Sequence, residues 1–223
     1  MSDHDSARTV AQAQVIGAVR VALVCDILDA LGLRSQALDP DIGPLCQGRT
    51  LTGRAFTAVS GEVDEIPEVP YVGLLRALDA VGQGDVFVLA TSRTEKSAMW
   101  GELLSTTCLA RGVRGVVTDG YARDTAQIAA LGFPTFCRGA YPLDIHGRSE
   151  VADFGVPVVI DGVVVSPGDL IVADDDGVVV VPTDVVDEVV TRARAKADGE
   201  NAFRDAVRGG MLPSEAYDRF KVL

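Results

Sequence analysis

The middle of the chain alternates short apolar runs with stretches in which apolar residues recur at helical spacing. Runs of about four to eight apolar residues indicate buried strands, and the helical spacing indicates helices that pack one face against them. The predicted strands are 55–59, 85–90, 115–118 and 134–137, and the predicted helices are 15–32, 71–81, 101–111 and 125–131. This β-α-β-α order predicts an α/β fold with a central, mostly parallel sheet sandwiched by helices.

The pattern changes after residue 150. Short Val-rich stretches at 156–160, 163–165, 170–172 and 178–181 alternate with Asp-Gly and Pro-Gly turns. Asp161-Gly162 is typical of a tight β-hairpin. The C-terminal helical segment 183–223 follows, with a long helix at 185–208 and a shorter one at 214–220. The C-terminal half is therefore predicted to be β-rich and to end in a long helix.

Residues 1–223 contain no linker, repeat or low-complexity stretch, so a single compact domain is expected, with the polar residues 1–12 disordered. Nearly half of the residues, 48%, are apolar. No apolar run reaches the ~18–20 residues that a membrane span requires. The acidic N-terminus lacks the basic start and apolar segment of a signal peptide. These features predict a soluble, cytoplasmic protein without a membrane partner.

Charge and cysteine content narrow the function classes. The formal net charge of −12 argues against a nucleic-acid partner, which would require a basic face. Most cations are arginines, whose planar fork suits small carboxylate ligands. The four cysteines have no zinc-binding spacing, and Cys25 and Cys108 lie in apolar helical stretches. Buried, reduced thiols are expected, with a catalytic thiol as the alternative.

Several common active sites are excluded by the residues present. The sequence has no GxGxxG after a strand and no phosphate-binding loop. With His4 in the N-terminal tail, His146 is the one candidate catalytic histidine, which argues against Ser-His-Asp catalysis and His-rich zinc sites. None of Lys96, Lys196 and Lys221 lies in an apolar setting suited to Schiff-base chemistry. Carbonyl chemistry would therefore require a metal held by carboxylates and waters, which favours Mg²⁺ or Mn²⁺.

The residues that remain form a helix, a strand and a turn between Trp100 and Asp124. The turn 119–124 follows a strand, and ligands of parallel α/β sheets lie beyond the carboxyl ends of strands. The helix that begins near Gly101 offers N–H groups that can hold an anion. These parts suit a small oxo-acid. The N–H groups would bind its carboxylate, Arg123 would bind its carbonyl or developing enolate, and Asp124 would bind a metal.

Each part also has a purely structural interpretation. Asp124 followed by Gln127 matches a capping box at a helix start. Arg123 could be an ordinary surface arginine. Gly101 could serve only to relax a helix start. The run 174–176 is interpreted as a solvated turn rather than a metal site.

At these residues the sequence resembles the RraA-like family, which includes 4-hydroxy-4-methyl-2-oxoglutarate aldolases with oxaloacetate decarboxylase activity. The resemblance rests on Trp100-Gly-Glu-Leu-Leu, Gly115-Val-Val-Thr-Asp-Gly and Arg123-Asp124. Further matching segments, in the family's order, are 25–32, 53–58, 142–148, 166–174 and 177–182. The segment after Gly61 departs from many members, which carry an Asp-Asn-Leu motif and a downstream histidine there. Because of that departure, the resemblance indicates the type of reaction more firmly than the identity of the substrate.

The resemblance implies a homotrimer or a dimer of trimers. It places the substrate on Gly101, Glu102, Leu103 and Leu104 together with Arg123, and the divalent metal on Asp124. It also implies a carboxylate from the C-terminal helix of a neighbouring subunit, for which Glu200 is the candidate.

The hypothesis is a metal-dependent carbon–carbon lyase, a class II aldolase that cleaves a 4-hydroxy-2-oxo-dicarboxylate to pyruvate and decarboxylates oxaloacetate. Mg²⁺ and Arg123 would stabilise the charge that develops on the substrate oxygen. Glu102 or Glu200 would orient the water that moves the proton. The alternative, from relatives of another class, is a regulator that binds and inhibits ribonuclease E. A structural relative with a lost activity is a third option.

Overall fold

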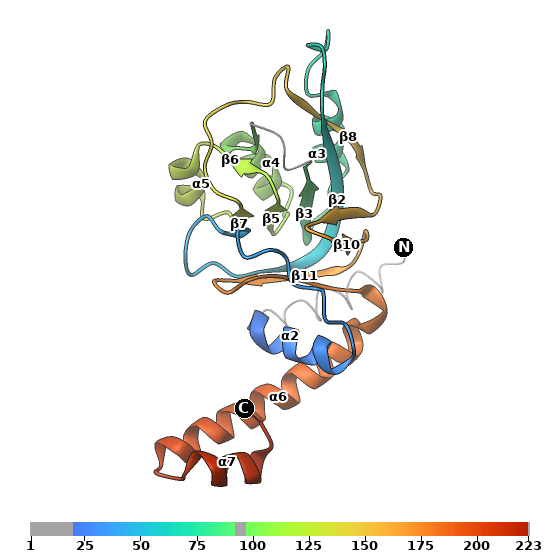
Figure 1. The fold of residues 1–223 in the computed structure, drawn as a ribbon. Coiled ribbons are helices and arrows are strands. Elements are labelled where there is room, and N and C mark those ends of the chain that lie inside the picture. Colours follow the sequence, from blue (N-terminus) through green and yellow to red (C-terminus); the bar gives the residue numbers. More distant parts are fainter. Residues whose placement is uncertain (1–19, 92–96, 223) are drawn as a thin grey trace.

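An eight-stranded, nearly closed sheet forms the body of the molecule (Figure 1). The computed structural model describes residues 20–91 and 97–222. The sheet runs in the order β1-β7-β5-β3-β2-β11-β12, with β8 paired to β2. Its strands are β1 (Gly43–Pro44), β2 (Leu51–Glu62), β3 (Asp85–Ala90), β5 (Gly115–Thr118), β7 (Thr135–Cys137), β8 (Ser149–Phe154), β11 (Leu170–Asp174) and β12 (Gly177–Val181).

The four strands at the centre of the sheet, β2, β3, β5 and β7, are parallel. Antiparallel strands β1, β8, β11 and β12 flank them. The loop before β2 joins the two ends of the sheet. Its residues 36–38 are hydrogen bonded to β12, through Leu38 N–H to Val178 O at 2.9 Å and Val180 N–H to Gln36 O at 2.9 Å. It then continues as β1 against β7, so the sheet curls round on itself.

The central strands are buried on both faces. In β3, Val86, Val88 and Ala90 point into the curled sheet, where the hairpin of β9 (Val158–Ile160) and β10 (Val163–Val165) also packs. The alternate residues Phe87 and Leu89 point outward against helices. Side chains of successive strand residues face opposite sides, and such double burial explains the continuous apolar runs.

Two groups of helices cover the sheet (Figure 1). On one side α3 (Val72–Ala80), α4 (Glu102–Ala110) and α5 (Thr125–Leu131) share a core with β3 and β5. On another side α2 (Val21–Ala30) and α6 (Val186–Arg208) pack on β11 and β12, after the short 3₁₀ turn η1 (Thr183–Val185). The predicted mostly parallel sheet between helices is confirmed.

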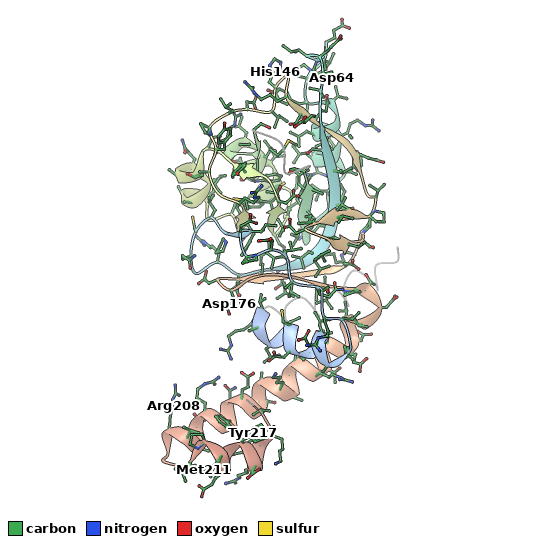
Figure 2. The ribbon with its side chains drawn as sticks, viewed as in Figure 1. Asp64, His146, Asp176, Arg208, Met211 and Tyr217 are labelled. Atoms are coloured by element: carbon green, nitrogen blue, oxygen red, sulfur yellow. The ribbon has the colours of Figure 1, made fainter. Side chains whose placement is uncertain are left out.

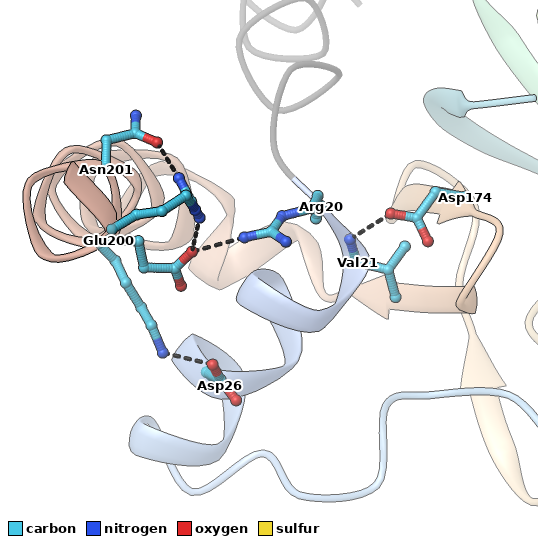
Figure 3. A network of polar contacts seen from close by, with 8 residues as sticks. Arg20, Val21, Asp26, Asp174, Glu200 and Asn201 are labelled. Atoms are coloured by element: carbon cyan, nitrogen blue, oxygen red, sulfur yellow. Dashed lines mark hydrogen bonds and ion pairs between the residues drawn. The ribbon is translucent and has the colours of Figure 1, made fainter. Parts of the chain in front are cut away.

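The far half of α6 extends away from the body, and α7 (Pro213–Phe220) folds back along it (Figure 1). Figure 2 shows Met211 and Tyr217 at this end and His146 at the opposite end. Polar contacts anchor the near half of α6 to α2: Lys196 Nζ bonds to Asp26, and Arg20 Nη2 lies 2.7 Å from a carboxylate oxygen of Glu200 (Figure 3).

The structure confirms most predicted elements within a residue or two at each end. The Asp161-Gly162 hairpin turn is present, with φ of 52° and 83°, as a turn of this type requires. Strand β2 is longer than the predicted 55–59, and β8 is an addition. Residues 1–12 and the start of the predicted helix 15–32 lie outside the described residues. Among the described residues, no helix is long and apolar enough to cross a membrane.

Candidate active site

Two short parallel strands outside the main sheet build the platform of the site. Strand β4 (Ala98–Trp100) pairs with β6 (Tyr121–Ala122), and both end at the same point. Gly101 follows the first strand and Arg123 the second. The Arg123 N–H donates to Trp100 O at 2.9 Å, so the two predicted site segments are neighbours.

Gly101 stands at the start of α4 with an extended backbone, φ −158°. A side chain there would place its Cβ 3.1 Å from Asp124 Oδ2 and 3.4 Å from Arg123 Cγ. The absence of a Cβ therefore lets Arg123 and Asp124 approach the helix start. Gly101 also has a local role, since its carbonyl accepts the first hydrogen bond of α4 from Ser105 N–H at 3.1 Å. Every helix leaves its first N–H groups without a partner inside the helix, and those of α4 begin here.

Asp124 begins α5, but its side chain does not cap that helix. The capping-box interpretation with Gln127 is therefore wrong. Asp124 has φ 55°, in the left-handed region, whereas a capping residue is extended. Its Oδ2 instead faces the start of α4, 3.4 Å from Glu102 N and 3.8 Å from Arg123 Nε. These contacts are long and the side chain is 41% exposed, so the carboxylate can accept another partner.

Arg123 lies between two carboxylates. Its Nε faces Asp124, and its Nη2 lies 3.4 Å from Asp144 Oδ1. The other oxygen of Asp144 accepts a hydrogen bond from the Tyr71 hydroxyl. Arg123 differs from an ordinary surface arginine in facing two carboxylates from different parts of the chain and in lining a cavity.

The Tyr71–Asp144 pair has perturbed acidity. The hydrogen bond to Asp144 raises the pKa of Tyr71 above its ordinary value, and burial and the Asp144 charge add to this. Burial by itself raises the pKa of Asp144, but the hydrogen bonds from Tyr71 and the Ile145 N–H and the charge of Arg123 outweigh it. The pKa of Asp144 is therefore lowered, so Asp144 is ionised and Tyr71 protonated at neutral pH.

A cavity of about 310 Å³ opens beside Arg123, between α3 and α4. Its polar groups come from four residues: Tyr71 just before α3, Thr107 on α4, Arg123 just after β6, and Asp144 between β7 and β8. The remaining wall is mainly apolar. That wall includes Leu74, Leu75, Leu78, Met99, Trp100, Leu103, Leu104 and Ile145. An ion pair beside an apolar cavity is the usual form of a small-molecule site.

The structure brings most of the predicted residues to one place. Leu103 is 71% exposed and lines the cavity with Leu104. Glu102 lies at the same helix start, with its carboxylate accepting a hydrogen bond from Thr106 Oγ1 at 2.7 Å.

Glu200 is placed elsewhere within one chain. It lies on α6, where it contacts Arg204 and also Arg20, which is shown with it in Figure 3. Helix α6 lies across β11 from α4 (Figure 1). One chain thus leaves Glu200 away from Asp124, and its role in a neighbouring subunit's site stays a prediction.

Asp124 suits a divalent cation such as Mg²⁺, which is often held by one or two carboxylates and keeps several waters. The described residues hold a second group of carboxylates, Asp39, Asp41 and Asp161, whose oxygens lie within 4.8 Å of one another. No prediction had singled out this group. Its Asp41 is paired with Arg138 at 3.0 Å.

The run 174–176 is a hairpin turn, as predicted, and it also binds neighbouring backbone. Asp174 Oδ2 accepts the Val21 N–H at the start of α2 (Figure 3), and Asp175 accepts the Gly48 N–H. These bonds give the two aspartates structural roles.

The expected burial of the cysteines is found for two of them. All four are free; Cys108 and Cys137 are buried, while Cys25 and Cys46 are half-buried. Burial raises the pKa of Cys108 to about 12 and also raises that of Cys137. Their thiols stay protonated near neutral pH and are poor nucleophiles. His146 is exposed, with its ring 5.9 Å from that of Tyr71.

Comparison with known proteins points to one family. A family model for RraA-like proteins, described as Aldolase/RraA, matches residues 21–180. A protein of Halalkalibacterium halodurans named "Putative 4-hydroxy-4-methyl-2-oxoglutarate aldolase" is 30% identical over 194 residues, 87% of each chain. Protein DlpA of Legionella pneumophila is 32% identical over 199 residues, which are 89% of this chain and 32% of DlpA. The chain thus spans about a third of DlpA's length.

Two solved structures share the fold. One, an uncharacterised protein from Pseudomonas syringae, superposes with a TM-score of 0.82 at 32% identity, covering 92% of this chain and 96% of that one. The other, from Streptomyces coelicolor, is described as an unusual member of the RNase ES inhibitor RraA protein family. It superposes with a TM-score of 0.80 at 32% identity, covering 86% of this chain and 96% of that one.

Proposed function

The chain belongs to the RraA-like family, and we propose that it is a divalent-metal-dependent carbon–carbon lyase acting on small 2-oxo-dicarboxylates. The proposed reactions are retro-aldol cleavage of a 4-hydroxy-2-oxo-dicarboxylate and decarboxylation of oxaloacetate. The observation that carries the proposal is the meeting of Arg123, Asp124 and the start of α4 beside one cavity. The relatives named as aldolases support the reaction class.

Binding follows from the groups at the mouth of the cavity. The first N–H groups of α4 and the guanidinium of Arg123 provide donors and positive charge for the substrate's C1 carboxylate and C2 carbonyl. Asp124 would hold the divalent ion, whose chemistry is to polarise that carbonyl as a Lewis acid. The homotrimer or dimer of trimers belongs to the same proposal, since it would bring Glu200 of a neighbour to the site.

Both reactions break the C3–C4 bond and leave its electron pair on pyruvate as the enolate. In decarboxylation the other product is CO₂. In retro-aldol cleavage a base first removes the C4 hydroxyl proton, and the C4 fragment leaves as a carbonyl compound. Arg123 stabilises the negative charge on the C2 oxygen, which is larger in the transition state than in the substrate. Protonation at C3 then gives pyruvate. Glu102, at the start of α4, is the carboxylate of this chain that we assign to the proton transfers.

The test is pyruvate release from oxaloacetate by purified protein, with and without Mg²⁺. We expect turnover that depends on Mg²⁺, and a loss on the order of 100-fold in Asp124→Asn, because the ion and its Lewis-acid effect are lost. Asp176→Asn, in the exposed turn after β11, is the matched control. Turnover no higher than that of Mg²⁺ alone, or an unchanged Asp124→Asn, would exclude this site as the catalytic centre.

A binding function is the second candidate, favoured by the likeness to the Streptomyces coelicolor protein of the RNase ES inhibitor family. On that hypothesis the chain binds a ribonuclease of the E type and lowers its rate without catalysis of its own. Inhibition of purified ribonuclease E that Arg123→Ala and Asp124→Asn leave intact, together with absent lyase turnover, would establish this function over the first.

A further inference from the structure

Tyr71 and Asp144 lie beside the proposed catalytic arginine, although neither is among the predicted site residues. We propose that they form a positioning pair that holds the Arg123 guanidinium in its substrate-binding orientation. The inference rests on the proposed function, in which Arg123 binds the substrate. It adds two residues that act through Arg123 rather than on the substrate.

Two ion pairs flank the guanidinium. Asp144 Oδ1 faces Nη2 at 3.4 Å, while Asp124 Oδ2 faces Nε at 3.8 Å. Carboxylates that face two different nitrogens of one planar fork favour one orientation of the guanidinium. The remaining N–H groups of the five that an arginine carries stay available for a carboxylate ligand.

The Tyr71 hydroxyl fixes the plane of the Asp144 carboxylate. It donates to Oδ2, so both oxygens of Asp144 are engaged. The Asp144 backbone is held as well, by a parallel bridge to Ala98 and by the Ala98 N–H, which donates to Leu143 O at 2.8 Å. Ala98 belongs to β4, the strand that ends at Gly101. One strand thus sets the position of both the pair and the helix start that binds the substrate.

The backbone of Tyr71 gives an independent indication. Its φ of 64° lies in the left-handed region, which bulky residues rarely adopt and which costs free energy. Asp124, on the other side of Arg123, is also in this region, with φ 55°. Such strain persists where the surrounding structure holds it and is frequent at functional sites. Here the two strained residues stand on either side of Arg123.

Kinetics of Asp144→Asn test the pair. The change removes the charge that faces Nη2 but keeps the shape of the side chain. We expect kcat/KM for oxaloacetate to fall on the order of 10-fold, mostly in kcat, because Arg123 acts on charge that develops in the transition state. Asp144→Glu should restore part of the rate, and Tyr71→Phe should show a smaller loss. Asp79→Asn, an exposed carboxylate on α3, is the control.

A purely structural role predicts a different result. In that case Asp144→Glu would be as inactive as Asp144→Asn, and the activity of each variant would follow its melting temperature. That outcome would overturn the inference.

A second readout does not depend on turnover. In protein labelled with ¹⁵N-arginine, the side-chain signals of Arg123 are assigned by their loss in Arg123→Lys. We expect Asp144→Asn and Tyr71→Phe to move these signals toward those of free arginine, and Asp79→Asn to leave them in place. Unmoved signals in both variants overturn the pair even if oxaloacetate is consumed. Moved signals in a protein without turnover support the pair and count against the proposed function alone.

Discussion

Two acidic regions of this molecule, one around Asp41 and one around Asp124, differ in their surroundings. Asp39, Asp41 and Asp161 lie close together and could by position hold a cation; Asp39 accepts the Asp41 N–H, and Asp41 pairs with Arg138. Asp124 has fewer carboxylates near it. It lies instead beside a helix start and an arginine that faces two carboxylates, and this arginine lines a cavity of about 310 Å³.

From this difference we expect the catalytic metal at Asp124 and not at the denser group. A metal that acts on a substrate needs room for the substrate and groups of opposite charge beside it. Substitutions in each of the two regions can decide which of them carries the chemistry.

The largest effect is expected for Arg123→Ala. The loss of the guanidinium should lower kcat/KM for oxaloacetate by about 3 kcal/mol of transition-state stabilisation, or on the order of 150-fold. The measurement is steady-state pyruvate release at saturating Mg²⁺. Arg192→Ala, which removes an exposed arginine paired with Glu188 on α6, should keep the native rate. Equal rates in Arg123→Ala and Arg192→Ala would show that Arg123 does not contribute to catalysis.

A smaller effect is expected for Gly101→Ala. The added Cβ would lie 3.1 Å from Asp124 Oδ2, so this side chain must give by a few tenths of an ångström, whereas the 3.4 Å to Arg123 Cγ is close to ordinary contact. We expect a loss of about 3-fold in kcat/KM, since a misplacement much smaller than 1 Å costs well under the roughly two orders of magnitude that 1 Å can cost. Gly61→Ala in β2, where a Cβ meets nothing within 4 Å, is the matched control. A fully active Gly101→Ala would show that close approach is not required.

Tyr71→Phe should change the pH dependence more than the maximal rate. The Tyr71 hydroxyl lowers the pKa of Asp144, together with the Ile145 and His146 N–H groups and Arg123. Without it, the Asp144 pKa rises and the carboxylate that holds Arg123 is protonated at a higher pH. The acid-side loss of kcat/KM should therefore begin at a higher pH than in the native protein.

The pH profile of kcat/KM measures this shift, with Tyr217→Phe on α7 as control. His146 and Arg148 also lie close to Tyr71 and Asp144, and both residues are kept in the Tyr71→Phe variant. An unmoved acid limb would indicate that Asp144 does not control the rate.

No change is expected for Asp41→Asn. If the second group of carboxylates is not the catalytic metal site, the Mg²⁺ concentration for half-maximal rate stays at its native value. A titration of activity with Mg²⁺ measures it, next to Asp124→Asn. A large increase in Asp41→Asn would reverse the comparison between the two groups.

Sequence patterns predicted the parts of the fold that are decided locally. Strands β3 and β5 are continuous apolar runs because both of their faces are buried, and their bounds match the prediction. Strand β8 was missed. Its buried residues are Ser149 and Val151, and it pairs with the end of β2 on both sides of a bulge at Val59/Ser60, so tertiary contacts define it rather than its own sequence.

The site was predictable only in part, because tertiary contacts rather than local sequence bring some of its residues together. Gly101, Arg123 and Asp124 stand at strand and helix ends and match family motifs, so the sequence led to them. Tyr71 was interpreted as an ordinary first residue of a helix. Its bond to Asp144 joins positions 73 residues apart, and the fold alone brings them together.

The loop that joins the two ends of the sheet has a consequence for association. An open strand edge presents rows of N–H and C=O groups on which another chain can add a strand, a route to aggregation. Here residues 36–38 occupy that position on β12, and β1 occupies it on β7. Copies of this protein therefore cannot extend the sheet at these strands. Contact between copies at these two edges has to be made by side chains, which makes it depend on specific surface residues and open to change by single substitutions.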